Sequence, residues 1–218
     1  MDIVLKYFSD FTEKQLKQFG QLEELYKDWN TKINVISRKD IDSLYEKHVL
    51  HSLSIAATFD FPAGTEVIDI GTGGGFPGVP LAIFFPQVKF HLVDSINKKL
   101  KIIEAVKEAI GLDNVTTQHS RAEEIKSRKF DFAVSRAVAP LGDLWRWSKP
   151  LLKNSTFKIK TENGERVENY PTHQNTHQPL IEDFAEAVLA NRESRADGEI
   201  GKAIAVLEER IYESYRPE

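Results

Sequence analysis

The chain has 218 residues, 41% of them hydrophobic, and a net charge of −4, so it can bury a full core and we expect one domain with additions. The absence of cysteine excludes disulfides, thiolate nucleophiles and cysteine-based zinc sites. No apolar run approaches the roughly 18 residues of a transmembrane helix, and the N-terminus lacks the regions of a signal peptide, so we expect a cytoplasmic protein without membrane partners.

Residues 1–62 are predicted to form a helical N-terminal cap. Apolar residues recur at spacings of three and four between Leu16 and Trp29, which is typical of an amphipathic helix. The capping residues place its start at Thr12 and its end near Asn30. A second helix is predicted over residues 41–59, after which a Pro-Ala-Gly sequence ends the pattern.

Residues 63–160 are predicted to form a core in which strands and helices alternate. The predicted strands are Val67–Ile70, Lys89–Asp94, Asn114–Gln118, Phe130–Ser135 and Phe157–Lys160. Helices are predicted from near Pro77, over Asn97–Ile110 with Gly111 as the C-cap, and over Leu141–Leu151. This alternation predicts an α/β, Rossmann-like fold, with a mostly parallel sheet, helices on both faces and ligands at the carboxyl ends of the strands.

Residues 161–218 do not continue the alternation and are predicted to form an atypical, acidic helical tail. Glu165–Pro179 is interpreted as a loop, followed by helices over Leu180–Asn191 and Glu199–Tyr215. Residues 126–160 hold nine basic and two acidic side chains, whereas residues 161–218 hold six basic and thirteen acidic ones. The basic block suits a polyanionic substrate, or it is a basic surface exposed to solvent. The net charge changes from positive to negative near residue 160, which indicates a boundary between two parts of the chain.

The first predicted strand runs into a turn, Asp69–Gly78, that holds five of the chain's twelve glycines. Glycine reaches positive φ freely and has no Cβ to keep a ligand off the backbone. Residues 73–78 match the dinucleotide fingerprint Gly-x-Gly-x-x-Gly, whereas Asp69, Gly71 and Gly73 begin a methyltransferase-like Asp-x-Gly-x-Gly-x-Gly. An acid repels a pyrophosphate but suits the sulfonium and ammonium of S-adenosylmethionine. We therefore favour that cofactor, with an NAD-type cofactor or an empty tight turn as alternatives.

Polar residues also follow the other strands. Asp94, 23 residues after Gly71, suits a ribose hydroxyl pair or the cap of the next helix. The backbone of Ala122 and the side chain of Glu123 suit an adenine edge, with a capping box as the alternative. Arg136 is expected to point into the cleft between cofactor and substrate, or to form a surface salt bridge.

Other aromatic and histidine residues give weaker predictions. The tryptophans of Trp145–Trp147 suit stacking on RNA bases, although one ring of such a pair more often packs in the core. The His173–His177 pair lacks a nearby acid and lies between prolines, so no metal site is predicted. His48 and His51 are interpreted as packing or capping residues.

Several segments of residues 1 to about 150 form a pattern that is recognisable as a whole: Trp29-Asn30, Ile33–Arg38, His48–Leu53, Asp69–Gly78, His91–Ser95, Arg121–Glu124 and Val134–Ala137. With these segments, this part of the chain closely resembles the RsmG/GidB family of 16S rRNA guanine-N7 methyltransferases, and most of all its Bacteroidetes members. The Phe-Pro-Gly after the glycines and the Ser-Arg-Ala at a strand end are specific to this family among methyltransferases.

The resemblance implies transfer of a methyl group from S-adenosylmethionine to N7 of a guanine in the 16S rRNA of the small ribosomal subunit. It also implies cofactor contacts by Gly71, Phe76, Ala122, Glu123 and Arg136. Guanine N7 already holds an in-plane lone pair, so no base must remove a proton, and catalysis reduces to alignment and exclusion of water. Arg136 or a nearby lysine is the candidate to read N7 and O6. The sequence leaves the oligomeric state open.

Residues from about 155 to 218 depart from that family and resemble the C-terminal end of Gfo/Idh/MocA-type NAD(P)-dependent oxidoreductases. The chain is therefore interpreted as a candidate fusion of two unrelated pieces. Our hypothesis is that methyl transfer is weakened because the substrate-side strands are replaced. The alternatives are an NAD(P)-dependent oxidoreductase, and a cofactor- or RNA-binding module without activity.

Overall fold

The computed structural model describes residues 1–33, 35–37, 40–153, 156–161 and 164–169. The chain divides into two compact units, Met1–Lys153 and Asn154–Glu218. In the described part of the chain, no helix has the length and apolar character needed to cross a membrane.

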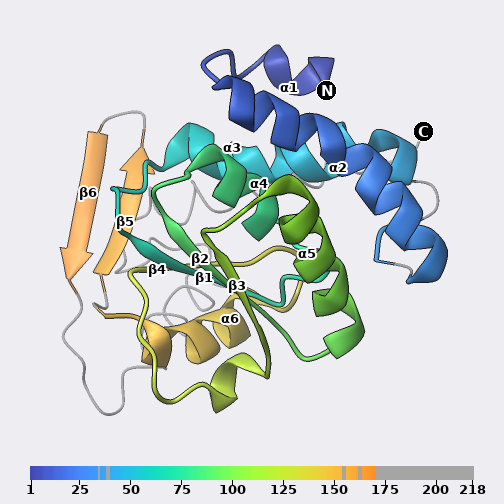
Figure 1. Ribbon diagram of the computed structural model, residues 1–218. Helices are drawn as coiled ribbons and strands as arrows, with labels where there is room; N and C mark the ends of the chain where they lie inside the picture. Colours follow the sequence, from blue (N-terminus) through green and yellow to red (C-terminus); the bar gives the residue numbers. More distant parts are fainter. Residues whose placement is uncertain (34, 38–39, 154–155, 162–163, 170–218) are drawn as a thin grey trace, which may run out of the picture. The chain divides into compact units, whose positions relative to one another are not determined.

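A four-stranded parallel sheet forms the centre of the first unit (Figure 1), which confirms the predicted α/β class. Its strands are β1 (Glu66–Ile70), β2 (Lys89–Asp94), β3 (Val115–His119) and β4 (Phe132–Val134), in the order β3-β2-β1-β4. The chain thus moves outward from β1 to β3 and returns to the other side of β1. The point of reversal, between β1 and β4, is where open α/β sheets bind ligands.

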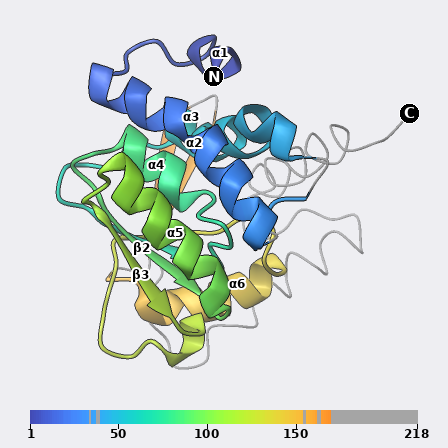
Figure 2. The same ribbon diagram turned by 45° about the vertical axis from the view of Figure 1, so that its right-hand side comes forward.

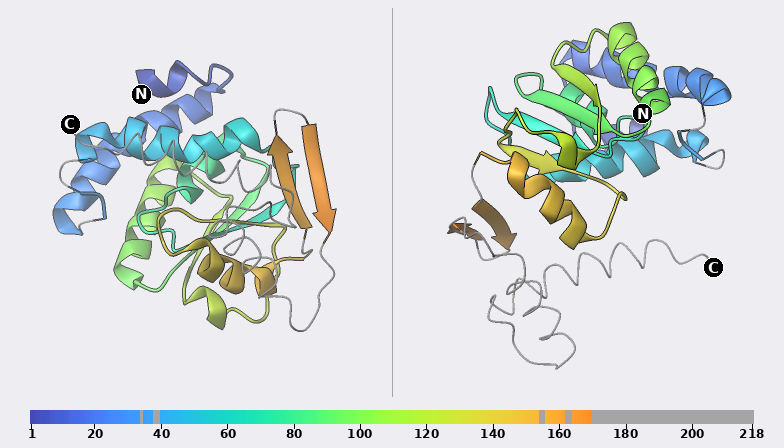
Figure 3. Two further views of the ribbon diagram at one scale, coloured as in Figure 1. Left: turned by 180° about the vertical axis from the view of Figure 1, so that it is seen from behind. Right: turned by 90° about the horizontal axis from the view of Figure 1, so that it is seen from below.

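Helices cover both faces of this sheet (Figures 2 and 3). A short helix, α1 (Asp2–Leu5), precedes α2 (Glu13–Lys32), and α2 contacts α4 (Gly78–Phe84) and α5 (Asn97–Ile110). The opposite face carries α6 (Leu141–Ser148), which continues into a 3₁₀ turn, Lys149–Leu151. The predicted bounds of β2 and α5 are confirmed, including the left-handed Gly111 that caps α5.

Alternation along the strands builds a hydrophobic core on each face. Val67 and Leu92 pack into the core shared with α2, α4 and α5, whereas Ile68 and Val93 face the core beside α6. Successive strand residues point to opposite faces, so a strand buried on both sides is a continuous apolar run. The N-terminal helices therefore share one core with the sheet.

Two buried glutamines fasten α2 to the helices beneath it. Gln15 Nε2 donates to the Ile83 carbonyl oxygen at 2.9 Å, and Gln18 Nε2 donates to that of Ile110 at 3.0 Å. They satisfy carbonyls at the C-terminal ends of α4 and α5, which have no partner within their own helix. α2 itself begins where predicted, because the Thr12 hydroxyl accepts from the Gln15 amide in a capping box.

The single helix predicted over residues 41–59 is divided into three. A 3₁₀ turn, Ile41–Ser43, precedes a π-helix, η2 (Tyr45–Leu50), and then α3 (His51–Thr58). Tyr45, Val49 and Leu53 recur every four residues and are all buried. The apolar pattern therefore indicates which face is buried, but it does not distinguish a π-turn from an α-turn.

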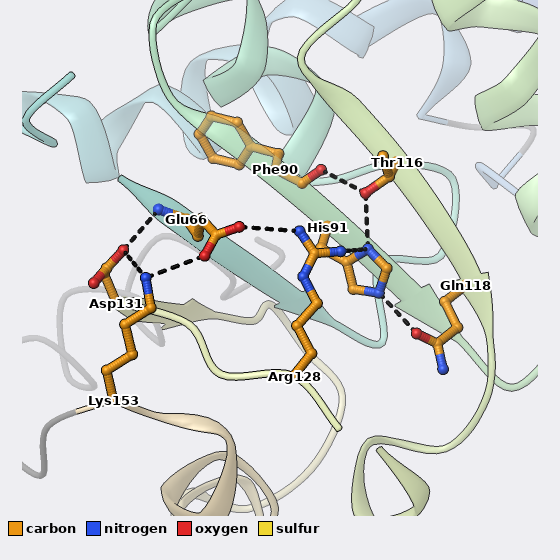
Figure 4. A network of polar contacts seen from close by, with 8 residues as sticks. All are labelled: Glu66, Phe90, His91, Thr116, Gln118, Arg128, Asp131 and Lys153. Carbon is orange, nitrogen blue, oxygen red and sulfur yellow. Dashed lines mark hydrogen bonds and ion pairs between the residues drawn. The ribbon is translucent and has the colours of Figure 1, made fainter. Parts of the chain in front are cut away.

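The end of the first unit is anchored beside the start of β1. Lys153 Nζ lies 3.1 Å from Glu66 Oε2 and 3.0 Å from Asp131 Oδ2 (Figure 4). Phe130 forms an isolated parallel bridge with Leu152. This pairing takes Phe130 out of the fourth strand, so β4 is shorter than predicted and begins at Phe132.

The same network continues across the sheet to His91. Arg128 Nη2 lies 3.4 Å from Glu66 Oε1, and its Nη1 lies 3.1 Å from His91 Nδ1 (Figure 4). A guanidinium only donates, so His91 Nδ1 accepts and the ring is neutral. His91 Nε2 then donates to Gln118 Oε1 at 2.9 Å.

The second unit contains an antiparallel pair, β5 (Thr156–Thr161) and β6 (Gly164–Asn169). The strand predicted at Phe157–Lys160 is confirmed. The loop predicted from Glu165 is wrong as far as Asn169, because backbone pairing between adjacent segments does not require an apolar face. The remainder of that loop, the His173–His177 pair and the helices predicted over Leu180–Asn191 and Glu199–Tyr215 lie outside the described residues.

Gly78 and Gly20 provide a matched test of packing. A Cβ on Gly78 would lie 2.7 Å from Asp69 Oδ2 and 2.8 Å from Leu92 Cγ, whereas a Cβ on Gly20 meets nothing within 4 Å. We expect Gly78→Ala to lower the free energy of unfolding by about 1–3 kcal/mol through overpacking. Gly20→Ala, within α2, should raise it by about 0.5–1 kcal/mol. Urea denaturation measures both, and equal effects would contradict the packing described.

The His91 network makes stability depend on pH. Burial lowers the pKa of His91, and the Arg128 charge adds to this, against the opposing effects of Gln118 and Glu66. The folded chain then binds fewer protons than the unfolded one, so this stabilisation is present above pH ~6.5 and is lost as the pH falls. In His91→Asn the amide oxygen keeps the acceptor without titrating. We expect its urea midpoint to fall less on acidification than that of the wild type; parallel curves would contradict this assignment.

Candidate cofactor site at the carboxyl edge of the sheet

The glycine turn lies at the carboxyl end of β1, ahead of α4. Gly71, Gly73 and Gly75 have φ values of +67°, +59° and +98°, which strain any other residue. A Cβ on Gly75 would collide with Val79 and approach the Tyr26 hydroxyl, so Gly75 serves internal packing. Gly73 faces open space and is partly exposed. Gly73 therefore leaves bare backbone that a cofactor can approach.

Asp69 lies beneath the turn and is fully buried. Its Oδ2 accepts hydrogen bonds from Thr72 Oγ1 at 2.6 Å and from the Gly78 amide at 2.9 Å. Oδ1 has no hydrogen-bond partner among the described residues. Burial raises the pKa of Asp69 to about 7, although the bonds from Thr72 and Gly78 and the charge of Arg136 oppose the rise. Asp69 therefore closes the turn onto the start of α4.

Asp94 joins the same turn to the start of α5. Its Oδ2 accepts from the Gly73 amide at 2.9 Å, and its Oδ1 accepts from the Ile96 amide at 2.8 Å. Lys99 Nζ lies 3.8 Å from Oδ2. The capping role that the sequence left open is not present, because α5 has no side-chain cap hydrogen bond and Asp94 instead bonds to the amide of Ile96, the residue that precedes the helix. The expected ribose contact stays a prediction.

The segment after β3 reaches the same edge of the sheet, since parallel strands end on one side. Ala122 begins a short 3₁₀ helix, η3 (Ala122–Glu124), and packs in the core that contains Ile70. Glu124 Oε2 accepts from the Arg121 amide at 3.2 Å, so Glu124 makes the capping contact. Glu123 is exposed at this edge. Its predicted adenine contact stays a prediction.

Arg136 follows β4 and reaches back to the N-terminal helices. Its Nη2 donates to His48 Nδ1 at 2.8 Å and its Nη1 donates to the Lys47 carbonyl oxygen at 3.1 Å. Nη1 also lies 3.3 Å from His51 Nδ1, and the guanidinium carbon lies 5.5 Å from the centre of the Phe76 ring. Arg136 thus connects the turn, β4 and η2.

The loop after β4 also contacts the turn after β1. A Cβ on Gly71 would come within 2.5 Å of Val138 Cγ2, and the preceding Ala137 has a φ of 53°. These two segments flank the point where the strand order reverses. The structure therefore brings Gly71 and the Arg136 segment together, as the topology predicts.

The sequence did not identify the residues that support the turn from the N-terminal helices. The Phe76 ring centre lies 5.0 Å from those of both Tyr26 and His48. The Tyr26 hydroxyl donates to the Gly74 carbonyl oxygen at 2.6 Å. His48 and His51 were predicted to pack or cap, yet both contact Arg136. Their spacing of three, which places side chains on one helix face, was the available signal.

The two tryptophans of α6, on the opposite face of the sheet, have different surroundings. Trp147 packs against the core beside α6, as expected for one ring of the pair. Lys149 Nζ lies 5.9 Å from the centre of the Trp145 ring, and Arg146 forms an ion pair with Asp143 at 2.6 Å. Stacking of Trp145 on RNA stays a prediction.

Comparison with known proteins identifies the family. Residues 15–190 match the family model GidB, described as rRNA small subunit methyltransferase G. The match covers most of the chain, including the glycine turn and Arg136.

The chain belongs to the GidB family.

Individual relatives agree with this membership. A ribosomal RNA small subunit methyltransferase G from Bacteroides thetaiotaomicron is 66% identical over 144 residues, which cover 66% of this chain and 69% of the relative. A protein of the same name from Flavobacterium psychrophilum is 56% identical over 164 residues, covering 75% and 78%. A solved S-adenosylmethionine-dependent methyltransferase from Geobacter sulfurreducens, in complex with S-adenosylhomocysteine, shares 17% identity and a TM-score of 0.41 over 51% of each chain.

The family model and the two relatives named ribosomal RNA small subunit methyltransferase G confirm the GidB resemblance of the sequence. They give no support to the resemblance of the C-terminal segment to Gfo/Idh/MocA oxidoreductases. The GidB match itself continues to residue 190, well beyond the proposed junction near residue 155.

Asp69 offers a test of how this GidB turn is held. Asp69→Ala leaves the Gly78 amide and the Thr72 hydroxyl without their acceptor, and we expect it to lower the free energy of unfolding by about 2–4 kcal/mol. Asp69→Asn keeps an acceptor oxygen and should lower it by less than about 1 kcal/mol. Equal losses in urea denaturation at neutral pH would contradict the hydrogen-bonding role.

Comparing Asp69→Asn with the wild type at several pH values separates the effect of the Asp69 charge on stability from the effect of its hydrogen bonds. The folded pKa of about 7 lies above the unfolded value near 3.9, so the folded state binds more protons and Asp69 lowers stability as the pH rises from about 4 to 7. Relative to the wild type, Asp69→Asn should therefore gain stability across that range. A constant difference between the two curves would contradict the raised pKa.

Proposed function

We propose that this chain transfers a methyl group from S-adenosylmethionine to N7 of a guanine in the 16S rRNA of the small ribosomal subunit. The description of the matched family and the names of relatives at 56–66% identity support methylation of small-subunit ribosomal RNA. A ribosomal substrate implies a cytoplasmic protein. The finer assignment to guanine N7 is the activity that the family resemblance implies.

One observation carries the choice of cofactor. The Gly78 amide, at the start of α4, donates to Asp69 Oδ2 at 2.9 Å. In dinucleotide-binding folds the corresponding helix N-terminus binds a pyrophosphate. Here a buried carboxylate already takes that amide and would repel the phosphates. The geometry favours S-adenosylmethionine, which carries no phosphate, over NAD(P), and so disfavours the oxidoreductase alternative.

We propose that Gly71, Gly73 and Asp94 hold this cofactor at the ends of β1 and β2, with Phe76 and Arg136 beside it. When bound, S-adenosylmethionine supplies a methyl group on a positively charged sulfur. The partly exposed backbone of Gly73 allows close approach, while the buried Phe76 ring helps to exclude water. The segment that begins at Ala122 and Glu123 closes the adenine end of the same edge.

The target atom needs little chemistry from the protein. Guanine N7 and O6 are both acceptors at one edge of the base, and a guanidinium donates to such a pair. We propose that Arg136, at the reversal point of the sheet, orients the guanine. Alignment of N7 with the methyl group is then the main contribution of the chain. The nine basic residues within 126–160 supply attraction for the RNA backbone.

The direct test is methylation of small subunits that lack the modification. The purified full chain should transfer labelled methyl from S-adenosylmethionine to one guanine, mapped by cleavage at N7-methylguanine. We expect Arg136→Ala to slow the transfer by roughly 100-fold or more, because a charged donor at the reacting edge is lost. Arg136→Lys keeps the charge but loses the planar, two-donor geometry of the guanidinium, so its rate of methyl transfer should lie between those of the wild type and Arg136→Ala.

Cofactor binding distinguishes the enzyme classes. Calorimetry should show binding of S-adenosylhomocysteine and none of NADH. Binding of NADH alone would overturn the proposed function. Binding of S-adenosylhomocysteine without methyl transfer would favour a binding module.

The C-terminal segment gives a second comparison. We keep the hypothesis that residues 161–218 weaken methyl transfer, since the strong identity to relatives covers 144 residues. The full chain should then act more slowly on the same subunits than the Bacteroides thetaiotaomicron relative. Equal rates would overturn this hypothesis and leave the activity intact.

A further inference from the structure

Arg136 is held by two histidines from a distant part of the chain. His48 lies in the π-helix η2, and His51 begins α3, 88 and 85 residues before Arg136. Nη2 of the guanidinium donates to His48 Nδ1 at 2.8 Å, and Nη1 lies 3.3 Å from His51 Nδ1. Nη1 also donates to the Lys47 carbonyl oxygen at 3.1 Å. Three successive contacts from one helical segment thus fix one side chain at the edge of the sheet.

The direction of these bonds determines the state of both rings. An arginine side chain has only donors, so both Nδ1 atoms act as acceptors and each ring carries its proton on Nε2. A doubly protonated imidazolium offers no acceptor, and its charge would repel the guanidinium. The contact to Arg136 therefore exists only while His48 and His51 are neutral.

The groups around the histidines favour the neutral rings. Burial first, and then the Arg136 charge, lowers the pKa of His48 to about 4 and also lowers the pKa of His51. Lys47 acts in the same direction on His48, while the Asp40 carboxylate opposes it. Of the two rings, His51 is exposed and His48 is half-buried against Phe76. Both rings are thus ready to accept at neutral pH.

We propose that His48 and His51 are positioning residues for methyl transfer, holding the Arg136 guanidinium through unprotonated Nδ1 atoms and releasing it on acidification. The proposal rests on the proposed function of Arg136. π-Helical turns are frequent at functional sites, and η2 carries both the Lys47 carbonyl and His48. The N-terminal helical region thereby acts on the reacting edge through Arg136.

Matched substitutions test the proposal kinetically. The amide oxygen of asparagine occupies the place of Nδ1 and accepts without titrating, so His48→Asn and His51→Asn conserve the contact; leucine removes it. At pH 7.5 we expect the double leucine variant to lose roughly 10- to 100-fold in kcat/KM on small subunits, as expected for lost charge-assisted bonds. The double asparagine variant should stay within about threefold. Thermal melts of every variant check folding.

The pH profile separates positioning from packing. Because the pKa of His48 is about 4, the wild-type rate should stay nearly level between about pH 7.5 and pH 5 and fall as the pH approaches 4 and the rings become protonated. The double asparagine variant, on the same subunits, should fall less, because its acceptors do not titrate. Leucine variants as active as the wild type, or asparagine variants with the wild-type profile, would overturn the proposal. If the double leucine variant does not fold, the exposed His51→Leu replaces it.

A measurement without turnover separates this proposal from the proposed function. Nitrogen NMR of the full chain at pH 7 should show the proton of both rings on Nε2. Removing the guanidinium charge with Arg136→Met should raise the pKa of His48 and of His51. Protons on Nδ1, or unchanged titrations, would overturn the proposal whatever the activity. A wild-type chain with these ring states that methylates no subunit would instead overturn the proposed function, and the catalytic part of the proposal with it.

Discussion

The cofactor edge of this protein depends on one buried carboxylate. Asp69 accepts from Thr72 within the turn and from Gly78 beyond it, so a single side chain determines the path of the glycines between β1 and α4. The close fit of Gly78 under Asp69 and Leu92 leaves no room for a side chain there. Because the carboxylate is fully buried, its hydrogen bonds are shielded from competing water. The glycines supply conformational freedom, and Asp69 selects one conformation from it.

The turn is supported from outside the sheet as well. Tyr26 on α2 bonds to the Gly74 carbonyl, and His48 packs on Phe76 while accepting from Arg136. α2 is in turn fastened to the ends of α4 and α5 by Gln15 and Gln18. The N-terminal helices are therefore part of the site, and their packing energy contributes to its rigidity. In many α/β proteins such additions only cover a face of the sheet.

The sequence predicted the parallel core well for a physical reason. Strands buried on both faces, such as β2, are continuous apolar runs, and glycine at the end of α5 marks its C-cap without tertiary information. The spacing of His48 and His51 placed both on one helix face, but their contacts with Arg136 were not predictable, since these contacts join segments more than 80 residues apart. A histidine's partner depends on tertiary packing, which periodicity does not report. The polar strand β6 was missed for a related reason, because its pairing is made by backbone and not by an apolar pattern.

The anchoring of Lys153 fixes the end of the first unit independently of the residues that follow it in the sequence. Its ammonium group bonds to Glu66 and Asp131, and Leu152 pairs beside Phe130, so the parallel core is complete where the first unit ends. The residues that follow Lys153 are therefore not needed to hold the end of the first unit against the sheet. Changes downstream of Lys153 therefore leave these contacts of the core in place, whereas a change at Glu66 would disturb the first strand and the junction together.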